Sequence, residues 1–475
     1  MTDASNPTQP AATAATATFA ALDLPAALRD NLLTLGYRHM TPIQAQSLPL
    51  MLAGRDVIAQ ARTGSGKTAA FGLGLLSRLE TSNFRVQALV LCPTRELADQ
   101  VARELRRLAR AIHNIKVLTL CGGTPFGPQV GSLEHGAHII VGTPGRVEEH
   151  VRKGKLILSD LQTFVLDEAD RMLDMGFQPA LDAIVERLPQ HRQTLLFSAT
   201  YPAGIQAMAA RIMQQPVMVK VDATHDSRTI EQHFYRLDER QSRIEALLLL
   251  LHQHRPQSAL VFCNTKREAD EVAQALGEHG VSALPLHGDL EQRDRDQTLV
   301  RFANKSASVL VATDVAARGL DLDALDAVIN YHVAHDPEVH VHRIGRTGRA
   351  GSSGIACTLF SEQERHRLIR LEIYLDQSLP AESLPTRSLL ASKAVTPPMA
   401  TLQIDGGKKQ KVRPGDILGA LTCAHGVDGQ RVGKIHLFDH CAYVAVERSA
   451  AQQALKTLRE GKIKGRHFRV RPIPG

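Results

Sequence analysis

The sequence predicts an α/β protein with two parallel-sheet domains, followed by a small α+β module. Seven short apolar runs carry this prediction, each followed directly by polar or glycine-containing residues: ALVLCPT, HIIVGTP, FVLDEAD, TLLFSAT, ALVFCNT, SVLVATD and AVINY. Helical-looking stretches such as 96–111 and 267–278 separate several of them. Short apolar runs bounded in this way are typical of strands buried on both faces of a parallel sheet. Ligands of such sheets bind beyond the carboxyl ends of the strands, where the polar residues lie.

Two polar breaks divide the series of runs. The first is the segment DATHDSR, and the second combines four prolines with serine, alanine and threonine. Such composition is typical of linkers. The predicted organisation is a disordered tail at 1–18, a first domain at 19–221, a linker at 222–228, a second domain at 229–376, a linker at 377–400 and a module at 401–475.

Composition narrows the class of protein. The chain has 475 residues, of which 43% are hydrophobic and 22% charged, as in ordinary globular proteins. Its unbroken apolar runs, such as Ala246–Leu251, are too short to cross a membrane. The first eighteen residues contain no Lys, Arg or hydrophobic block, which argues against a secretory signal. The six cysteines form no CxxC pair, so we expect reduced thiols and a cytoplasmic protein.

The first chemical motif is ARTGSGKT, residues 61–68. It follows the apolar run DVIA and precedes the helical-looking AAFGLGLLSRL. A glycine-rich loop between a strand and a helix presents backbone N–H groups to phosphates. Lys67 is expected to reach the β- and γ-phosphates, and the Thr68 hydroxyl to bind Mg²⁺. A glycine-rich turn without a nucleotide is the alternative, which this setting disfavours.

The second motif, Asp167-Glu-Ala-Asp170, ends the apolar run TFVL. Alone, an acidic turn is usually a solvated loop or a helix cap. Downstream of a phosphate loop, Asp167 is expected to hold Mg²⁺ and Glu168 to activate or orient the attacking water.

With these motifs, the chain resembles the DEAD-box ATP-dependent RNA helicases from residue 19 to about residue 375. The motifs occur in the family's order: GYRHMTPIQ, ARTGSGKT, PTRELA, GG, TPGR, DEAD, SAT, VFCNT, QRDR, ATDVAARGLD and HRIGRTGR. Ala61 departs from the general phosphate-loop pattern but agrees with that of the family. The resemblance implies two tandem RecA-like domains, ATP and Mg²⁺ as cofactors, and local unwinding of short RNA duplexes rather than long-distance translocation.

The resemblance also assigns residues to ATP. Lys67, Glu168, Arg346 and Arg349 would be catalytic, and the two arginines would contact the γ-phosphate from the second domain. Gln44 would select adenine, Phe19 would offer a stacking face and Asp321 would lie at the ribose. Taken alone, Phe19 is more simply explained as a core anchor. The remaining ATP-binding positions are Thr63, Gly64, Ser65, Gly66, Lys67 and Thr68.

Two further groups follow from the resemblance. Ser198, Thr200, His342 and Arg343 would couple hydrolysis to unwinding, with Arg343 joining the network of motifs. The core RNA contacts would be Arg95, Gly123, Thr143 and Arg146 in the first domain and Thr265, Gln292, Arg295, Thr313 and Asp314 in the second. Hydroxyls, glycine N–H groups and arginines suit a sugar–phosphate backbone, so the core should read little sequence.

The C-terminal module is predicted to be the basic part of the chain. It holds 14 Lys and Arg against 6 Asp and Glu, a net charge of +8, so the remainder carries −1 of the total of +7. Its apolar pattern predicts the order βαββαβ of an RNA-recognition (RRM-like) module. Two of three aromatic positions expected in its third strand are lost and Gln403 occupies the aromatic site of the first strand, which disfavours base stacking on the sheet. Charge is the stronger feature, with Lys462, Arg466 and Arg469 near the last strand as candidate phosphate contacts.

This module resembles the C-terminal domain of DbpA-type bacterial helicases. That resemblance implies a hairpin of large-subunit (23S-type) ribosomal RNA and pre-ribosomal particles as partners, and a role in ribosome assembly. We expect a monomer with no membrane and no DNA partner. Three alternatives stay open: a helicase or RNP remodeller acting on messenger or structured RNA with the module as a tether, an ATP-gated RNA clamp, and a basic module used for dimerisation.

Overall fold

The computed structural model describes most of the chain: residues 17–61, 64–221, 230–238, 241–317, 320, 324–348, 353–423 and 426–473. It divides into two compact units between residues 224 and 225. Within the described residues, no helix is both long and apolar enough to span a membrane.

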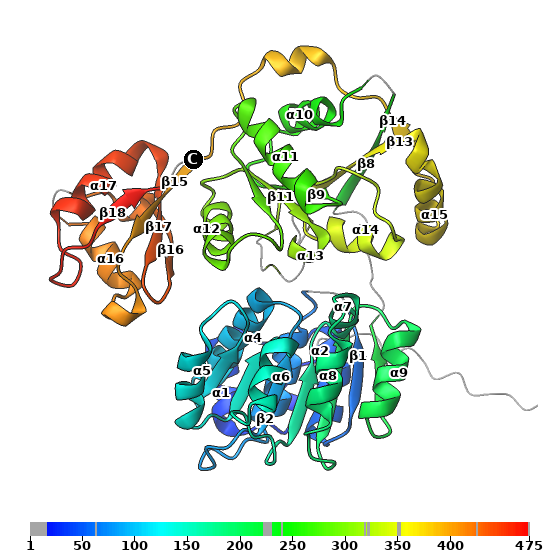
Figure 1. Ribbon diagram of the computed structural model, residues 1–475, viewed down its shortest axis with the longest axis vertical. Helices are drawn as coiled ribbons and strands as arrows, with labels where there is room; N and C mark the ends of the chain where they lie inside the picture. Colours follow the sequence, from blue (N-terminus) through cyan, green and yellow to red (C-terminus); the bar gives the residue numbers. More distant parts are fainter. Residues whose placement is uncertain are drawn as a thin grey trace, which may run out of the picture. The chain divides into compact units, whose positions relative to one another are not determined.

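The first unit, coloured blue to green in Figure 1, is built around a seven-stranded sheet. The strand order in this sheet is β3-β4-β2-β5-β6-β1-β7. Every pairing in it is parallel. The strands are β1 (Val57–Gln60), β2 (Ala88–Leu91), β3 (Val117–Leu120), β4 (Ile139–Gly142), β5 (Thr163–Leu166), β6 (Gln193–Ser198) and β7 (Val217–Lys220). The central strands are buried on both faces, which explains why their sequences are apolar without alternation.

Helices cover both faces of this sheet. One apolar core forms under the helices from α1 to α4, and a second under α6 to α9. The bounds are η1 (Phe19–Ala21), α1 (Ala26–Thr34), α2 (Pro42–Leu52), α3 (Lys67–Leu76), α4 (Arg95–Leu108), α5 (Phe126–Glu134), α6 (Pro144–Arg152), α7 (Ala169–Asp174), α8 (Gln178–Val185) and α9 (Ala203–Ile212). Because all strands run the same way, the loops that follow β1, β4, β5 and β6 meet at one edge of the sheet.

The second unit contains another parallel sheet, in the order β10-β11-β9-β12-β13-β8-β14. Its strands are β8 (Ile230–Leu237), β9 (Ala259–Cys263), β10 (Ala283–Leu286), β11 (Val309–Thr313), β12 (Ala327–Asn330), β13 (Gly354–Ser361) and β14 (Ala381–Glu382). Its helices are α10 (Arg243–His254), α11 (Lys266–Glu278), α12 (Gln292–Ala303), α13 (Asp314–Ala317), α14 (Pro337–Ile344), η2 (Glu362–Glu364), α15 (Arg365–Leu375) and η3 (Arg387–Ala391). The predicted fold of two parallel-sheet domains is confirmed.

The segment expected to be an open linker, 377–400, contacts this second sheet domain. Ala381–Glu382 adds an edge strand beside β8, and Leu379 is buried. The Ser392 hydroxyl lies 2.9 Å from Nδ1 of His252 on α10, and Arg387 forms an ion pair with Glu245. Its prolines and small residues predict a linker, but scattered apolar residues such as Leu384 reach the core of the domain.

The module has the predicted order βαββαβ and a four-stranded antiparallel sheet, β16-β17-β15-β18. Its elements are β15 (Met399–Ile404), η4 (Lys408–Gln410), α16 (Pro414–Leu421), η5 (Gly429–Arg431), β16 (Val432–Leu437), β17 (Ala442–Glu447), η6 (Arg448–Ala450), α17 (Ala451–Glu460) and β18 (Val470–Pro472). The last strand is shorter than the predicted 467–473, and residues 463–466 before it form a tight turn with Lys464 and Gly465 in the left-handed region.

Part of the second sheet domain covers one face of the module. Leu402 and other apolar residues of the module's strands pack under its two helices, so Thr401 and Tyr443 lie on the opposite sheet face. Both are nevertheless buried. The side chains of Asn304 and Ser306, after α12, lie 3.1 Å and 2.7 Å from the Thr401 hydroxyl, and His436 Nε2 lies 3.1 Å from Asn304 Oδ1.

Candidate ATP and RNA sites

The phosphate loop joins β1 to α3. Gly64 and Gly66 have φ of +83° and +91°, which L side chains rarely adopt, and a Cβ on Gly66 would lie 2.5 Å from Nε2 of Gln44. Lys67 is the first residue of α3 and is buried, with its ammonium donating to the carbonyl of Ala61 at 2.7 Å. Ser65 and Thr68 are half-buried, and Thr68 occupies the second helical position. Thr63 lies outside the described residues. The loop therefore presents a helix N-terminus, the element that favours anionic phosphate.

The predicted adenine reader lies against this loop. Gln44 is buried, accepts from the Thr41 N–H at 2.9 Å and donates to the Gly66 carbonyl at 3.0 Å. Its amide therefore caps α2 and links that helix to the phosphate loop. Phe19 is also buried in the core of the first unit, with its ring 6.0 Å from that of Tyr37 in an edge-to-face contact, and its stacking on adenine stays a prediction.

Two acids lie at the end of β5. Asp167 is 3% exposed, and its Oδ1 has no hydrogen-bond partner among the described residues. Burial raises the pKa of Asp167 to about 7, and the opposing charge of Lys67 limits the rise. Glu168 is the residue before α7 and adopts the left-handed conformation, and its carboxylate pairs with Arg171 one turn on. A buried carboxylate oxygen without a donor is poised for a cation.

The predicted coupling residues meet this acidic turn. Asp170 Oδ2 accepts from the N–H of Ala199 at 3.2 Å and from the N–H and hydroxyl of Thr200, each at 3.0 Å. Ser198, at the end of β6, is buried. Asp170 had no predicted role of its own, although its place in the DEAD turn was a signal.

The predicted RNA contacts of the first unit include Arg146, which is held by a residue that no sequence motif singles out. Gln129 Nε2 donates to the carbonyl of Cys121 at 3.0 Å and to the Thr124 hydroxyl at 2.5 Å. Its Oε1 accepts from Arg146 at 3.0 Å and lies 2.9 Å from His150 Nε2. The side chain of Gln129 thus holds Arg146 beside the turn that contains Gly123.

The other three predicted contacts lie at strand and loop ends. Thr143 precedes α6, Gly123 has φ of +72°, and Arg95 begins α4, with Asp99 at 3.8 Å. All belong to the edge at which the strands end, where the sequence pattern places them.

In the second unit, Arg343 is at the centre of a buried network. It is 2% exposed, and its guanidinium contacts both carboxylate oxygens of Asp314 at 2.7 Å, Asn330 Oδ1 at 3.2 Å and the His332 carbonyl at 3.1 Å. It also lies 5.1 Å from the ring of Phe262. Asp314, predicted to contact RNA, therefore orients Arg343.

Arg343 and Arg346 do not lie on one continuous helix. The helix α14 ends at Ile344, and Gly345 begins a turn. Arg346 is buried and donates to the carbonyl of Leu320 at 3.3 Å, a different acceptor from those of Arg343. His342 is half-buried on α14. Arg349 and Asp321 lie outside the described residues.

The remaining predicted RNA contacts of this unit have local partners. The Thr265 hydroxyl caps α11 by accepting from the Glu268 N–H at 3.1 Å. Gln292 donates to Asp296 at 2.8 Å, and Arg295 donates to the Ala316 carbonyl at 3.2 Å. Thr313 is buried at the end of β11. The structure places all four near the ends of β9 and β11 or on the first turn of α12.

The three candidate phosphate contacts of the module lie before its last strand. Lys462, Arg466 and Arg469 are exposed in the segment 461–469. The residues at the aromatic positions are not open to solvent: Gln403 is 4% exposed, and Tyr443 is 3% exposed. Stacking of bases on this face is disfavoured, whereas the charged segment is accessible.

Comparison with known proteins gives the class first. Residues 41–208 match the DEAD/DEAH box helicase family, residues 242–351 the helicase conserved C-terminal domain and residues 401–472 the DbpA RNA binding domain. The chain is 56% identical over 448 residues to the ATP-dependent RNA helicase DbpA of Escherichia coli (strain K12), covering 94% of this chain and 97% of that protein. It therefore belongs to the DbpA-type DEAD-box ATP-dependent RNA helicases, and the family resemblance seen in the sequence motifs is confirmed.

Two other relatives agree with this assignment. The DEAD-box ATP-dependent RNA helicase CshA of Geobacillus kaustophilus (strain HTA426) is 43% identical over 369 residues, covering 78% of this chain and 79% of that protein. The structure of S. cerevisiae Dbp5 bound to RNA and ADP BeF3 has a TM-score of 0.71 and 29% identity, covering 77% of this chain and 95% of that chain. The protein is thus an RNA-dependent ATPase and RNA helicase that binds ATP and RNA.

Proposed function

We propose that this helicase is directed by its C-terminal module to large-subunit ribosomal RNA, where it locally unwinds short duplexes during ribosome assembly. The single observation that carries this proposal is that the module combines buried residues on its sheet face with an exposed cationic segment. Thr401, Gln403 and Tyr443, on the sheet face opposite its helices, are buried. The exposed cationic segment of the module includes Lys462, Arg466 and Arg469. Such a surface binds phosphates by charge and shape. The matching DbpA RNA binding domain supports the choice of RNA.

Mg²⁺ fits the residues present in the first unit. The buried Asp167 Oδ1 lacks a donor among the described residues, and a divalent cation prefers oxygen ligands of this kind. Asp167 and the Thr68 hydroxyl would hold the ion, which neutralises charge on the transferred phosphoryl group when bound.

The other residues have distinct proposed roles toward ATP. Lys67 and the N-terminus of α3 bind the phosphates, so Lys67 exchanges its contact with the Ala61 carbonyl for phosphate oxygens. Glu168 orients the attacking water and accepts its proton, and Arg171 holds the Glu168 carboxylate in place. Arg346 and Arg349 stabilise charge on the γ-phosphate.

Strand separation requires that ATP binding and hydrolysis change the affinity of the protein for RNA. Asp170 joins the acidic turn directly to Thr200, so a shift of either is transmitted to the other. In the second unit, the pair of Asp314 and Arg343 joins the end of β11 to α14 in the same way. A ligand shifts a conformational equilibrium only by its differential affinity for the two states, and these links supply a physical route for that bias.

We place the protein in the cytoplasm as a monomer.

The targeting is tested by binding of a large-subunit ribosomal RNA fragment over a range of salt concentrations. Replacing Lys462, Arg466 and Arg469 by Ala should flatten the plot of log affinity against log salt by nearly one unit for each lost phosphate contact. The control is Lys456→Ala, which removes an exposed charge from α17. An unchanged slope in the triple variant would rule out electrostatic docking through this segment.

A further inference from the structure

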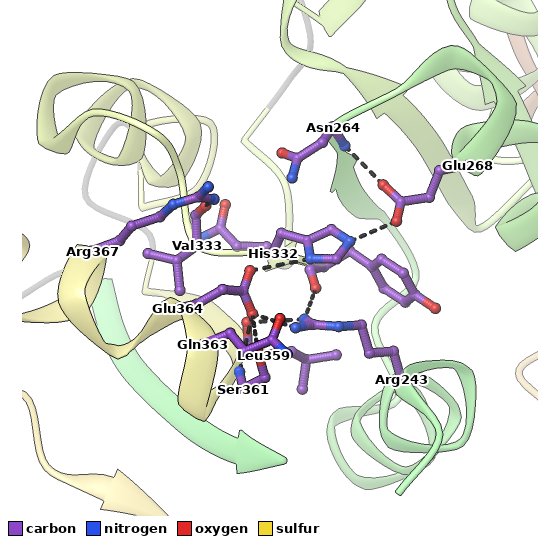
Figure 2. Close-up of polar contacts among 12 residues, drawn as sticks. Arg243, Asn264, Glu268, His332, Val333, Leu359, Ser361, Gln363, Glu364 and Arg367 are labelled. Atoms are coloured by element: carbon purple, nitrogen blue, oxygen red, sulfur yellow. Dashed lines mark hydrogen bonds and ion pairs between the residues drawn. The ribbon is translucent and has the colours of Figure 1, made fainter. Parts of the chain in front are cut away.

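A charged cluster lies where β9, β12 and β13 end in the second unit (Figure 2). At its centre is His332, a half-buried residue two positions after β12. Its Nε2 lies 2.6 Å from Oε1 of Glu268 on α11, and its Nδ1 lies 3.1 Å from Oε1 of Glu364 on η2. Each ring nitrogen therefore has its own carboxylate.

These contacts require a particular charge state. A neutral imidazole carries one N–H, whereas a protonated imidazole carries two. Ionised carboxylates can only accept, so both contacts are hydrogen bonds only when His332 is protonated. The cluster was not evident from the sequence, because residues 268, 332 and 364 share no motif or spacing.

The carboxylates are held on their other side as well. Glu268 Oε2 accepts from the Asn264 N–H at 2.9 Å. Glu364 Oε2 accepts from the Ser361 N–H at 3.0 Å and pairs with Arg243 of α10. Arg243 in turn donates to the Tyr331 carbonyl at 2.5 Å. Contacts that do not involve the imidazole therefore orient both carboxylates.

The groups facing His332 come from four elements: Glu268 of α11, Glu364 of η2, Arg243 of α10 and Arg343 of α14. Burial disfavours the charged imidazole, but its hydrogen bonds with Glu268 and Glu364 outweigh burial and raise the pKa of His332. Burial opposes ionisation of Glu364 too, yet its bonds to His332 and Ser361 and the charge of Arg243 lower its pKa to about 2. The charged pairs on both sides of the ring therefore reinforce one another.

The cluster lies between two predicted functional segments. Through Glu268 it fixes the backbone of Asn264, the residue before Thr265, which is predicted to contact RNA. Through its own carbonyl, His332 accepts from Arg343 of the coupling network at 3.1 Å. A change in the protonation of the imidazole therefore affects both the Asn264–Thr265 segment and the network of Arg343.

We propose that protonated His332 is a positioning residue for RNA binding. By bridging Glu268 and Glu364, it fixes the position of the Asn264–Thr265 turn relative to Arg343. This inference rests on the proposed RNA contact of Thr265. Deprotonation removes one of the two bridging hydrogen bonds, so the grip on RNA weakens as pH rises through the range in which His332 loses its proton. RNA affinity should be fully retained at acidic pH and reduced at alkaline pH.

The first test compares two histidines of the same protein. In the full-length chain with ring-labelled histidines, the NMR titration of His332, assigned by its loss in His332→Gln, should have a midpoint above that of His279. His279 is exposed at the end of α11, with Nδ1 2.8 Å from the Ala275 carbonyl. A His332 midpoint equal to or below that of His279 would overturn the proposal.

The second test separates RNA binding from turnover. Between about pH 6 and 8.5, the RNA concentration giving half-maximal ATP hydrolysis should rise about threefold to tenfold in the unmodified protein, the effect of one charge-assisted hydrogen bond, while the maximal rate changes less. In His332→Gln, the RNA concentration giving half-maximal ATP hydrolysis should be high at every pH. His279→Gln should behave as the unmodified protein. Glu268→Gln should move the transition to lower pH.

The RNAs in this test distinguish the inference from the targeting proposal. Both a ribosomal fragment and an unrelated single-stranded RNA should show the pH effect, because the cluster acts in the helicase core. If neither RNA shows it, or if His332→Gln retains it, the inference fails whatever the module binds. If the two RNAs differ in affinity by the same factor at all pH values, targeting stands independently.

Discussion

Asp170 and Thr200 are joined by two hydrogen bonds of 3.0 Å, from the N–H and from the hydroxyl of Thr200 to the same carboxylate oxygen. The Ala199 N–H adds a third bond to that oxygen at 3.2 Å. The DEAD turn after β5 and the SAT motif at the end of β6 therefore meet at one atom. This contact gives the proposed coupling between hydrolysis and unwinding a physical basis.

Thr200→Ala should separate the two activities. The variant loses the hydroxyl bond but keeps both backbone bonds to Asp170, so RNA-stimulated ATP hydrolysis should fall by less than about threefold. Strand separation of a short duplex should fall by about tenfold or more, because it depends on the motion passed through this contact. Both rates are measured on one preparation, with Ser82→Ala, a change at an exposed residue, as the control. Equal losses of both activities would count against coupling through Thr200.

Gln129→Ala should weaken RNA binding without touching the phosphate loop. The change frees Arg146 from one of its acceptors and removes the bridge to His150. We expect the RNA dissociation constant to rise by about threefold to tenfold, with ATP affinity unchanged. Fluorescence binding assays measure both constants, and Gln190→Ala is the matched control because Gln190 is exposed. Unaltered RNA affinity would show that Gln129 does not position Arg146 for RNA.

Glu364→Gln should reveal a pH-dependent contribution to stability. The pKa of Glu364 falls from 4.5 to about 2 on folding, so its carboxylate stabilises the second unit above pH 4.5, and this stabilisation is lost as pH falls through about 2. At neutral pH the variant should lose about 2–3 kcal/mol of unfolding free energy, and the loss should shrink by about half near pH ~3.

Urea unfolding of the full chain measures this difference, with Glu362→Gln as the control. Glu362 lies two residues earlier and its side chain is 59% exposed, so its replacement should cost less than about 1 kcal/mol. A pH-independent loss in Glu364→Gln would mean that the carboxylate charge is not the source of the stabilisation.

Thr401→Val should loosen the module from the second sheet domain. The hydroxyl it removes is contacted by both Asn304 and Ser306. Spin labels on the module and on α15 should give a broader distance distribution in the variant, while affinity for an isolated ribosomal RNA hairpin stays within about twofold, because the exposed basic segment is intact. Thr422→Val, at an exposed helix end, is the control. A distribution as narrow as that of the unmodified protein would show that Thr401 does not hold the module.

Much of the fold could be predicted because burial on both faces of a sheet leaves a local record. The apolar runs that contain Leu89, Ile140 and Leu260 are strands in the structure, and these three residues are fully buried. The phosphate loop was equally predictable, since the glycines at 64 and 66 are required by their positive φ angles. These features depend on residues adjacent in sequence.

Contacts between residues that are far apart in the sequence could not be predicted, because they leave no local sequence pattern. The bridge of His332 to Glu268 and Glu364 joins three separate elements, and none of the three residues stands out in its own segment. The contacts of the Thr401 hydroxyl with Asn304 and Ser306 likewise join residues about a hundred positions apart in the sequence. The end of α14 at Ile344 could not be derived from the spacing of the arginines, which is also compatible with a longer helix.

The most direct test of targeting is ATP hydrolysis by the full chain with no RNA, with messenger-like RNA and with large-subunit ribosomal RNA. We predict strong stimulation by the ribosomal RNA alone, and loss of this preference on deletion of residues 401–475. Equal stimulation by both RNAs would contradict targeting and reduce the module to a general RNA tether.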